Sequence, residues 1–351
     1  FAEAERAAFI ESQFQAIGLH DVQQDELHNV YGRYPARQSS AHPPVIVSAH
    51  SDTVFPAETD LTIQCDGTII SGPGIGDNSM GVAGLLHLAQ TLLAHKIALP
   101  ADVWFVANVG EEGLGDLRGM RAVVDQFGQQ AAYIVIEGGL YGQIAHEAIG
   151  VRRFRVEVAV GGGHSWGSFG QKSAVHELAY LITAVDQLSV PESPKTTYNV
   201  GVIEGGTSIN TIAATACMQL DLRSEDSGQL ERLVDEVTDL VDMAQKKLGQ
   251  HGRITMTPIG NRPSGSIPRS NPLVTWATDA LRFVDCRHVA YIAGSTDANI
   301  PLSRGITAVC IGLTESGNAH RQDEFVDVSQ LPNGMRQALL LLLAAAGIGS
   351  E

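Results

Sequence analysis

The stretch ADVWFVANV, residues 101–109, is an apolar run typical of a strand buried inside a sheet. Two similar runs, PPVIVSAH (43–50) and AAYIVIE (131–137), lie on either side of it in the sequence. Between these three runs lie SMGVAGLLHLAQTLLAH (79–95) and LRGMRAVVDQF (117–127), which have the apolar spacing of helices. This strand–helix–strand–helix–strand order predicts an α/β domain with a mostly parallel sheet.

After about residue 150 the pattern changes, because VRRFRVEVAV (151–160) alternates polar and apolar residues as a half-exposed strand does. The elements expected after it are a helix at 172–188, strands near 197–204 and 213–222, a helix at 228–248 and a strand at 253–259. Their βαββαβ order predicts a small sheet with helices on one side, inserted as a lid. Buried-strand patterns return at 288–294 and 306–313. We therefore expect a first domain split into 1–150 and 262–351, with the lid at 151–261.

Composition limits the classes of partner. The 351 residues, 44% of them hydrophobic, are enough for two compact domains with their own cores. Thirty-nine acidic against 23 basic residues give a formal net charge of −16, and no Lys/Arg cluster occurs, so we expect no nucleic-acid partner. The longest apolar run, 338–346, is too short to span a bilayer, so we expect no membrane association.

Cysteine usage and the beginning of the chain bear on its location. The four cysteines are widely spaced with no C-x-x-C pair, which argues against a disulfide framework or a zinc knuckle. The chain begins at Phe1 inside a helical pattern, so we expect further sequence before it and leave a signal peptide open. The expected location is cytoplasmic.

Acidic and imidazole side chains follow several of the predicted strands. They are His50 and Asp52 after the first strand, Asp77 in GPGIGDNSMG, Glu111 and Glu112 in VGEEGLGD, Glu137 after the third strand, and His320 in GLTESGNAH. In an open α/β sheet, ligands gather outside the carboxyl ends of the strands. Imidazole and carboxylate ligands without cysteine favour divalent metal, and two metals need a shared carboxylate. Their positive charge would let Glu111 and Glu112 stand side by side, one as a ligand and one free to take a proton.

These motifs, in this order, resemble those of the M20 family of metallopeptidases and amidohydrolases, which includes carboxypeptidases, aminoacylases, desuccinylases and tripeptidases. The resemblance covers essentially the whole chain. It rests on HSDTVFP, GDNSMGVA, GEEGLGDLRG, IEGG, GGGHSW, GGTSINTIA, STDANIP and GNAHRQDE. It implies a zinc-exopeptidase-like catalytic domain interrupted by a smaller lid that serves for dimerisation.

The resemblance also implies a metal-ligand set. Asp77 would bridge two divalent metal ions, His50 and Glu137 would complete one site, and Glu112 and His320 would complete the other. The expected metal is zinc, with cobalt and manganese as alternatives.

Other catalytic-domain residues take implied roles as well. Glu111 would be the general base, and Asp52, on the same strand face as His50, would orient that imidazole. The peptide bond after the bridging aspartate is often cis in the family, so a cis Asp77–Asn78 bond is expected here.

The lid has implied roles of its own. His164 would reach the active site of a second subunit and stabilise the developing oxyanion there. Asn210, Arg223 and, more weakly, Arg262 would hold the substrate. We therefore expect a homodimer formed through the lid, with strand 151–160 as an edge that pairs across a two-fold axis.

The expected function is two-metal hydrolysis of an amide bond in small peptides or N-acyl amino acids. In the family that this chain resembles, the position of Glu137 tends to be Glu in carboxypeptidases and acyl-amino-acid hydrolases and Asp in aminopeptidases, so the resemblance favours one of the first two. The motif GEEGLGDLRG, in contrast, resembles that of tripeptidase-like members of the same family.

Two alternatives come from other classes. GHSWG (163–167) matches the G-x-S-x-G elbow of serine hydrolases, with Ser165 as nucleophile and Asp297 and His320 downstream. An elbow needs a helix directly after the serine, and the helical pattern begins only near Lys172. The other alternative is a non-catalytic binding protein, which would be expected to lack the base or a ligand.

Overall fold

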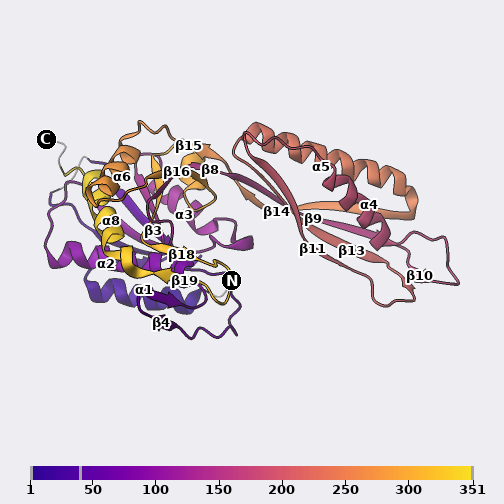
Figure 1. The fold of residues 1–351 in the computed structure, drawn as a ribbon, viewed down its shortest axis with the longest axis horizontal. Helices are drawn as coiled ribbons and strands as arrows, with labels where there is room; N and C mark the ends of the chain where they lie inside the picture. The colour runs from indigo at the N-terminus through magenta and orange to yellow at the C-terminus, as the bar shows by residue number, and fades with distance from the viewer. Residues whose placement is uncertain (1–2, 39–41, 349–351) are drawn as a thin grey trace. The chain divides into compact units, whose positions relative to one another are not determined.

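The computed structural model describes residues 3–38 and 42–348, and the chain divides into two compact units (Figure 1). Unit 1 consists of Phe1–Ala148 and Gly265–Glu351, and unit 2 consists of Ile149–Ser264. The domain limits expected from the sequence were 150/151 and 261/262. The roles expected for the two domains, catalytic domain and lid, stay predictions. Within the described ranges, no helix has the length and apolarity needed to cross a bilayer.

Unit 1 is built on a nine-stranded sheet whose central strands are parallel. Its path runs β1-β2-β6-β3-β7-β17-β8-β15, and β16 pairs with β8. The pairs β6–β3, β3–β7 and β7–β17 are parallel, so the prediction of an α/β fold with a mostly parallel sheet is confirmed. The strands are β1 (His20–Gln24), β2 (Val30–Tyr34), β3 (Val45–His50), β6 (Val103–Asn108), β7 (Ala132–Glu137), β8 (Gln143–Ala148), β15 (Gly265–Ser266), β16 (Ala290–Gly294) and β17 (Ala308–Gly312).

The helices of unit 1 pack on this sheet. They are α1 (Ala4–Ile17), α2 (Met80–Ala94), α3 (Arg118–Phe127), α6 (Pro272–Phe283), α7 (Asn299–Ser303) and α8 (Leu331–Ala345). α2 contacts β3, β6 and β7 through a face on which Leu85, Leu88 and Leu92 are buried at helical spacing. Every residue of β3 is buried, as expected for a strand inside a covered parallel sheet. This packing fixes the carboxyl ends of β3, β6 and β7 side by side.

A second sheet in unit 1 supports a glycine-rich loop. It has four short strands in the order β18-β19-β5-β4, namely β18 (Glu315–Gly317), β19 (Phe325–Asp327), β5 (Ile69–Ser71) and β4 (Gln64–Asp66). β5 leads into residues 72–79, and its partner β19 begins directly after Glu324. The pairing therefore places Glu324 beside the loop that carries Asp77.

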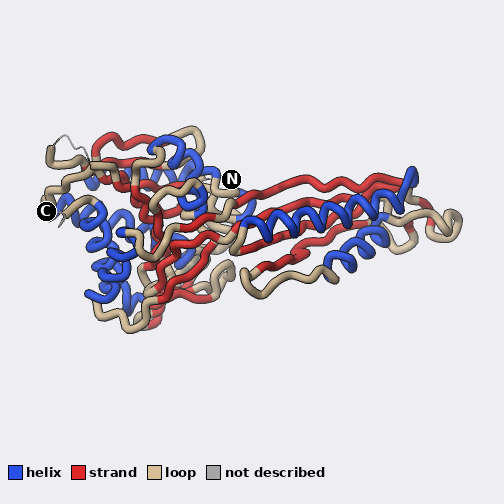
Figure 2. Tube along the Cα trace, turned by 90° about the horizontal axis from the view of Figure 1, so that it is seen from above, coloured by secondary structure: helices blue, strands red, loops and turns tan. Residues whose placement is uncertain are grey.

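Unit 2 is a four-stranded antiparallel sheet with two helices (Figure 2). Its main elements are β9 (Gly150–Val160), α4 (Ala174–Asp186), β11 (Thr196–Gly205), β13 (Thr215–Ser224), α5 (Ser227–Leu248) and β14 (Gly252–Arg262). Their order confirms the predicted βαββαβ arrangement. Val156, Val158 and Met218 of the sheet share one apolar core with Leu178 and Leu181 of α4, so the helices cover one face.

The expected position of strand 151–160 is wrong. The sheet order is β11-β13-β9-β14, so β9 lies inside and the edges are β11 and β14. Alternation of polar and apolar residues reports that one face of a strand is covered, and it carries no information about which strands pair at its sides.

Candidate metal centre

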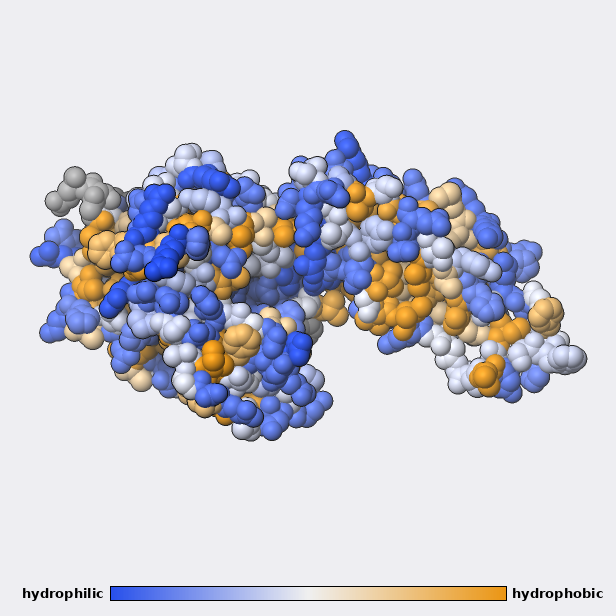
Figure 3. Space-filling model, viewed as in Figure 1, coloured by the Kyte–Doolittle hydropathy of each residue, from blue (hydrophilic) through white to orange (hydrophobic). Residues whose placement is uncertain are grey.

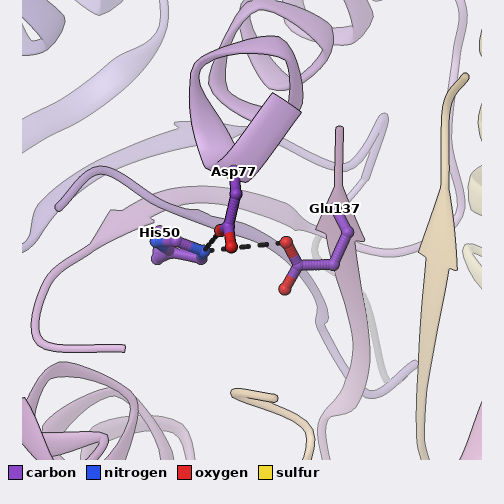
Figure 4. A group of neighbouring side chains, drawn as sticks. All are labelled: His50, Asp77 and Glu137. Atoms are coloured by element: carbon purple, nitrogen blue, oxygen red, sulfur yellow. Dashed lines mark ion pairs between the residues drawn. The ribbon is translucent and has the colours of Figure 1, made fainter. Parts of the chain in front are cut away.

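Three side chains at the carboxyl edge of the unit 1 sheet form a first group of possible metal ligands (Figure 4). His50 ends β3, Glu137 ends β7, and Asp77 lies in the turn Ile75–Ser79 before α2. His50 Nε2 lies 3.0 Å from Asp77 Oδ1 and 3.6 Å from Glu137 Oε2. Figure 4 shows the three side chains converging on one point.

Asp77 also belongs to a second group, with Glu112 and His320. His320 Nε2 lies 3.2 Å from Asp77 Oδ2 and 3.6 Å from Glu112 Oε2. The two oxygens of Asp77 thus face two different histidines. One carboxylate shared between two sets of nitrogen and oxygen donors is the arrangement that a two-metal site of the zinc type requires.

The state of two buried atoms tests whether these residues fit metal ions. His50 Nε2 and Glu112 Oε1 are inaccessible to solvent and have no hydrogen-bond partner. His50 Nε2 lies close to Asp77 Oδ1 without forming a hydrogen bond to it. A buried polar atom without a partner costs about 1–3 kcal/mol. A cation bound between these atoms would supply the missing partner, so the donor set fits divalent metal.

Asp52 connects the end of β3 with the adjacent glutamates. Its carboxylate accepts the backbone N–H of Glu111 at 3.2 Å and that of Glu112 at 2.9 Å. His50 Nδ1 lies 3.1 Å from the backbone oxygen of Asp52 and 3.6 Å from its carboxylate. Burial raises the pKa of Asp52, but His50 and the two N–H donors outweigh it and lower the pKa to about 2. An ionised Asp52 therefore holds the loop of the two glutamates.

Asn78 fixes the Asp77 turn to the end of β7. The Asp77–Asn78 peptide bond is cis, as the sequence led us to expect. The buried Asn78 side chain donates to the backbone oxygen of Ile136 at 2.9 Å, and accepts from Gly138 at 2.8 Å and from Gly81 at 3.1 Å. The amide thus joins three segments that meet at the candidate centre.

Glu324 fixes the same turn from the other side, and the sequence analysis missed it. Its Oε1 accepts the N–H groups of Gly76 and Asp77, both at 2.7 Å, and its Oε2 accepts that of Gly74 at 3.0 Å. Its place four residues after His320, inside GNAHRQDE, was the available signal. Glu324 is buried and accepts the backbone N–H of Asp77, so it positions that residue without belonging to either ligand group.

The ionisable groups perturb one another strongly. Burial, followed by repulsion from Asp77, raises the pKa of Glu112 to about 7. Burial raises the pKa of Glu137 as well, against the attraction of His50. Burial also opposes ionisation of Asp77, but the hydrogen bond to His320 and the nearby charge of His50 prevail and lower its pKa.

The pKa values of the two histidines of the centre, His50 and His320, are also shifted, and both are raised. Burial lowers the pKa of His50, but the charges of Glu137, Asp52 and Asp77 outweigh it and raise the pKa well above its usual value. The hydrogen bond to Asp77 raises the pKa of His320. Without metal, the cluster therefore retains protons that a cation would have to displace.

Asp297 is fully buried, interacts electrostatically with His50 and Glu137, and was not identified as a supporting group in the sequence analysis. Its Oδ2 accepts a hydrogen bond of 2.7 Å from the Asn108 side chain at the end of β6. Burial raises its pKa to about 7, with His50 acting in the opposite sense. The backbone oxygen of Asn108 accepts the N–H of Ser51 at 2.8 Å, so this network ties β6 to the segment after His50.

The remaining residues expected at the site belong to unit 2. His164 lies in the short strand β10 (Gly163–His164), opposite Thr211 of β12 (Thr211–Ile212). Ser165 donates its N–H to the backbone oxygen of Asn210 at 3.0 Å, so the segments of His164 and Asn210 lie together. Both side chains are exposed.

Arg223 and Arg262 lie on the two strands of the unit 2 sheet that flank β9. They occupy β13 and β14 on either side of the same β9 residue, Val151. Arg223 Nε donates to Asp221 Oδ1 at 2.6 Å, whereas Arg262 is buried. Their roles in substrate binding stay predictions, as do those of His164 and Asn210.

Ser165 lacks the local geometry of a serine-hydrolase elbow. It follows the two-residue strand β10 and lies in a turn, and the next helix, α4, begins only at Ala174. His320, the histidine that the serine mechanism would need, is engaged with Asp77 and Glu112. These observations argue against the serine-hydrolase alternative.

Comparison with known proteins gives a family. The model of peptidase family M20/M25/M40 matches residues 46–344. A "Probable carboxypeptidase" from Aspergillus oryzae is 29% identical over 247 residues, which are 62% of this chain and 55% of that protein. The chain thus spans about half the length of this relative. The succinyl-diaminopimelate desuccinylase of Corynebacterium glutamicum is 26% identical over 305 residues, covering 82% of this chain and 77% of that enzyme.

The fold has counterparts among solved structures. A tripeptidase from Staphylococcus aureus superimposes with a TM-score of 0.80 over 97% of this chain and 92% of its own, at 21% identity. At that identity the likeness concerns the fold alone, and it confirms the predicted architecture of an α/β domain interrupted by a smaller one.

Proposed function

The chain belongs to peptidase family M20/M25/M40, and we propose that it hydrolyses an amide bond in small peptides or N-acyl amino acids with the help of two divalent metal ions. The observation that carries the proposal is the Asp77 carboxylate, whose two oxygens face His50 and His320. His50 and Glu137 would hold one ion, and Glu112 and His320 the other. Zinc suits these donors, with cobalt or manganese as alternatives.

Two ions held there would polarise the scissile carbonyl and lower the pKa of a water molecule to about 7. The residues of the chain prepare this chemistry. His50 Nδ1 lies 3.1 Å from the backbone oxygen of Asp52, so once a cation has displaced the second proton the ring can donate its Nδ1 hydrogen there and leave Nε2 free as a ligand. Asp52 also fixes the backbone of Glu111 and Glu112. These contacts support the assignment of Glu112 as a ligand beside a neighbouring base.

Glu111 is the general base in this proposal. It is buried at the carboxyl edge of the sheet, next to Glu112 in the chain. Its carboxylate takes a proton from the attacking water and returns it to the nitrogen of the leaving amine, so that the amide C–N bond breaks and a carboxylate and an amine are released.

The names of two relatives indicate a general class of substrate. A probable carboxypeptidase and a desuccinylase are among them, and both kinds of enzyme release a free amino acid or an amine from an acyl group. We propose that this chain does the same. The alternative is a tripeptidase-like aminopeptidase, which the motif GEEGLGDLRG favours.

We also propose that two copies act together through unit 2. The edge strand β11 exposes Val202 and Ile203, with 40% and 57% of their surface accessible. Around His164 and Asn210, the side chains of Trp166, Phe169 and Ile209 are almost fully exposed. Apolar surface gathers on this unit in Figure 3. Exposed apolar clusters of this kind mark interfaces. A second copy that bound this part of unit 2 would receive His164 of the first copy in its active site, where the imidazole would stabilise the developing oxyanion.

The test is a substrate screen with purified, metal-loaded protein. Di- and tripeptides are compared with N-acetyl and N-succinyl amino acids, and the released amine is measured. We expect hydrolysis of at least one class that EDTA abolishes and added zinc, cobalt or manganese restores. A protein that binds metal and hydrolyses none of them would support a non-catalytic binding protein instead.

A further inference from the structure

A pocket of about 570 Å³ lies in unit 1 beside the two adjacent glutamates. Its walls are Glu3 and Arg6 of the α1 region, residues 51–57 after β3, and residues 112–114 after β6. Glu112 lines the pocket and is also a member of the second metal-ligand group. The pocket therefore adjoins the candidate metal centre, and its volume is in the range of small-molecule sites.

Arg6 is a cation in this pocket with few partners. Its Nη2 donates to Ser79 Oγ at 2.8 Å, and among the described residues no carboxylate lies within ion-pair distance of it. A guanidinium has about five N–H donors, so most of those of Arg6 are available to a ligand. Burial lowers the pKa of Arg6, against the attraction of Asp52, but the group stays charged at neutral pH.

The acidic residues of the same pocket are already engaged. Glu3 forms an ion pair with Arg118. Asp52 accepts the backbone N–H groups of Glu111 and Glu112, and the Glu112 side chain faces His320. Among the described residues that line the pocket, Arg6 is therefore a charged group without an ion pair, and Asp52 attracts it only from a longer distance.

The rest of the wall suits a short apolar chain. Val54 and Leu114 expose 40% and 53% of their surface, and Phe55 and Pro56 also line the pocket. A ligand that combines a short apolar chain with one anionic group would match both parts of the pocket.

We propose that this pocket is a substrate subsite in which Arg6 binds a carboxylate carried on the acyl side of the scissile amide. The inference rests on the proposed amide hydrolysis and adds a substrate class to it. A planar guanidinium can donate two parallel hydrogen bonds to a carboxylate, which gives the contact both strength and direction. The substrates are amides of short dicarboxylic acids: N-succinyl or N-glutaryl amino acids, or dipeptides that begin with glutamate.

Paired substrates that differ only in this charge test the proposal. N-succinyl-alanine is compared with N-succinamyl-alanine, and Glu-Ala with Gln-Ala, and each pair reports on one source of the carboxylate. In the wild-type enzyme, we expect kcat/KM to be about tenfold to hundredfold higher for the charged member of at least one pair. Arg6→Gln should bring that ratio close to one, and Arg6→Lys should keep part of it. Arg304→Gln, which removes a surface arginine paired with Asp125, should keep the wild-type ratio.

If Arg6 had only a structural role, through its hydrogen bond to Ser79, Arg6→Gln would lower kcat/KM for both members of a pair by the same factor. That result, or a wild-type ratio near one in both pairs, would overturn the proposal. Calorimetry of the metal-loaded protein with succinate and succinamate gives a readout without turnover. Tighter binding of succinate that Arg6→Gln removes supports the subsite even if no amide is hydrolysed, in which case only the proposed function has failed. Equal binding of the two ligands contradicts the subsite.

Discussion

Glu112 shows most clearly why the adjacent glutamates occur. It is held by a backbone hydrogen bond to Asp52, its Oε1 is buried without a partner, and its pKa is raised to about 7. Such a group is costly in a protein without metal and becomes favourable once a cation lies beside it. Its neighbour Glu111 shares the loop and, in the proposed mechanism, has a different function.

This division of labour predicts different outcomes for two conservative changes. Glu111→Gln should keep both metal ions and lower kcat by about 10²–10⁴-fold, because a proton acceptor is lost while the ligands remain. Glu112→Gln should weaken metal binding as well as turnover. Metal content and kcat measured on the same preparations decide the matter. Near-normal kcat in metal-loaded Glu111→Gln would show that the roles are assigned wrongly.

Metal affinity should depend on pH in a definite direction. The raised pKa values of Glu112, His50 and His320 mean that the empty site holds protons below neutrality, and a cation binds only after they leave. Affinity should therefore increase as the pH rises through about 7. Competition with a chelator at pH 6 and pH 8 should show binding at least about tenfold weaker at pH 6. Equal affinity at the two pH values would contradict the protonation of the empty site.

At the scale of elements, the site depends on one turn that is held by two buried side chains. Asn78 joins the Asp77 turn to β7, and Glu324 accepts three backbone N–H groups of the same turn. The turn is thus fixed before any metal binds, as pre-organised ligands require.

Glu324→Gln tests this support. The amide cannot accept all three N–H groups and places its own donors against them, so the protein should lose about 2 kcal/mol of stability and bind metal more weakly. Asp323→Asn is the matched control, because the adjacent Asp323 is exposed and pairs with Arg321 on the surface. Urea unfolding and metal titration of both variants give the comparison. If Glu324→Gln had the same free energy of unfolding and the same metal affinity as Asp323→Asn, the turn would not need the Glu324 carboxylate.

The sequence predicted the central elements well because their patterns are strong. Buried strands such as β3 and β7 are continuous apolar runs, and each ends in a polar residue of the site. The edge strand β1, with the residues HDVQQ, has no such pattern and was missed. The assignment of β9 to an edge was wrong because strand pairing depends on contacts between distant segments.

The same limit applies to the site. His50, Asp77, Glu112, Glu137 and His320 could be named because they stand in motifs at strand ends. The roles of Glu324 and Asp297 depend on hydrogen bonds to residues far away in the chain, which spacing does not reveal.

At the scale of the whole molecule, the proposed dimer predicts complementation. His164→Ala and Glu111→Gln should each be nearly inactive alone, because one lacks the oxyanion donor and the other the base. In a mixed dimer, one site would combine an intact Glu111 with an intact His164 of the other copy, and activity should return. Loss of an oxyanion donor typically costs about 2.7–4 kcal/mol in the barrier, so the recovery is measurable.

Size-exclusion chromatography with light scattering provides the control for this experiment. The wild-type protein should be a dimer at assay concentration. A fully active monomer, or a dimer whose mixed variants never recover, would end the proposal of shared sites and leave the metal chemistry untouched.

The central claim is that Asp77 bridges two metal ions, and metal stoichiometry tests it most directly. Elemental analysis of the protein after zinc loading and removal of free metal should give two ions per wild-type chain and fewer than one in Asp77→Ala, because both groups lose a ligand. Asp60→Ala, an exposed aspartate outside both groups, should retain two. Two tightly bound ions in Asp77→Ala, or none in the wild-type protein, would contradict the account.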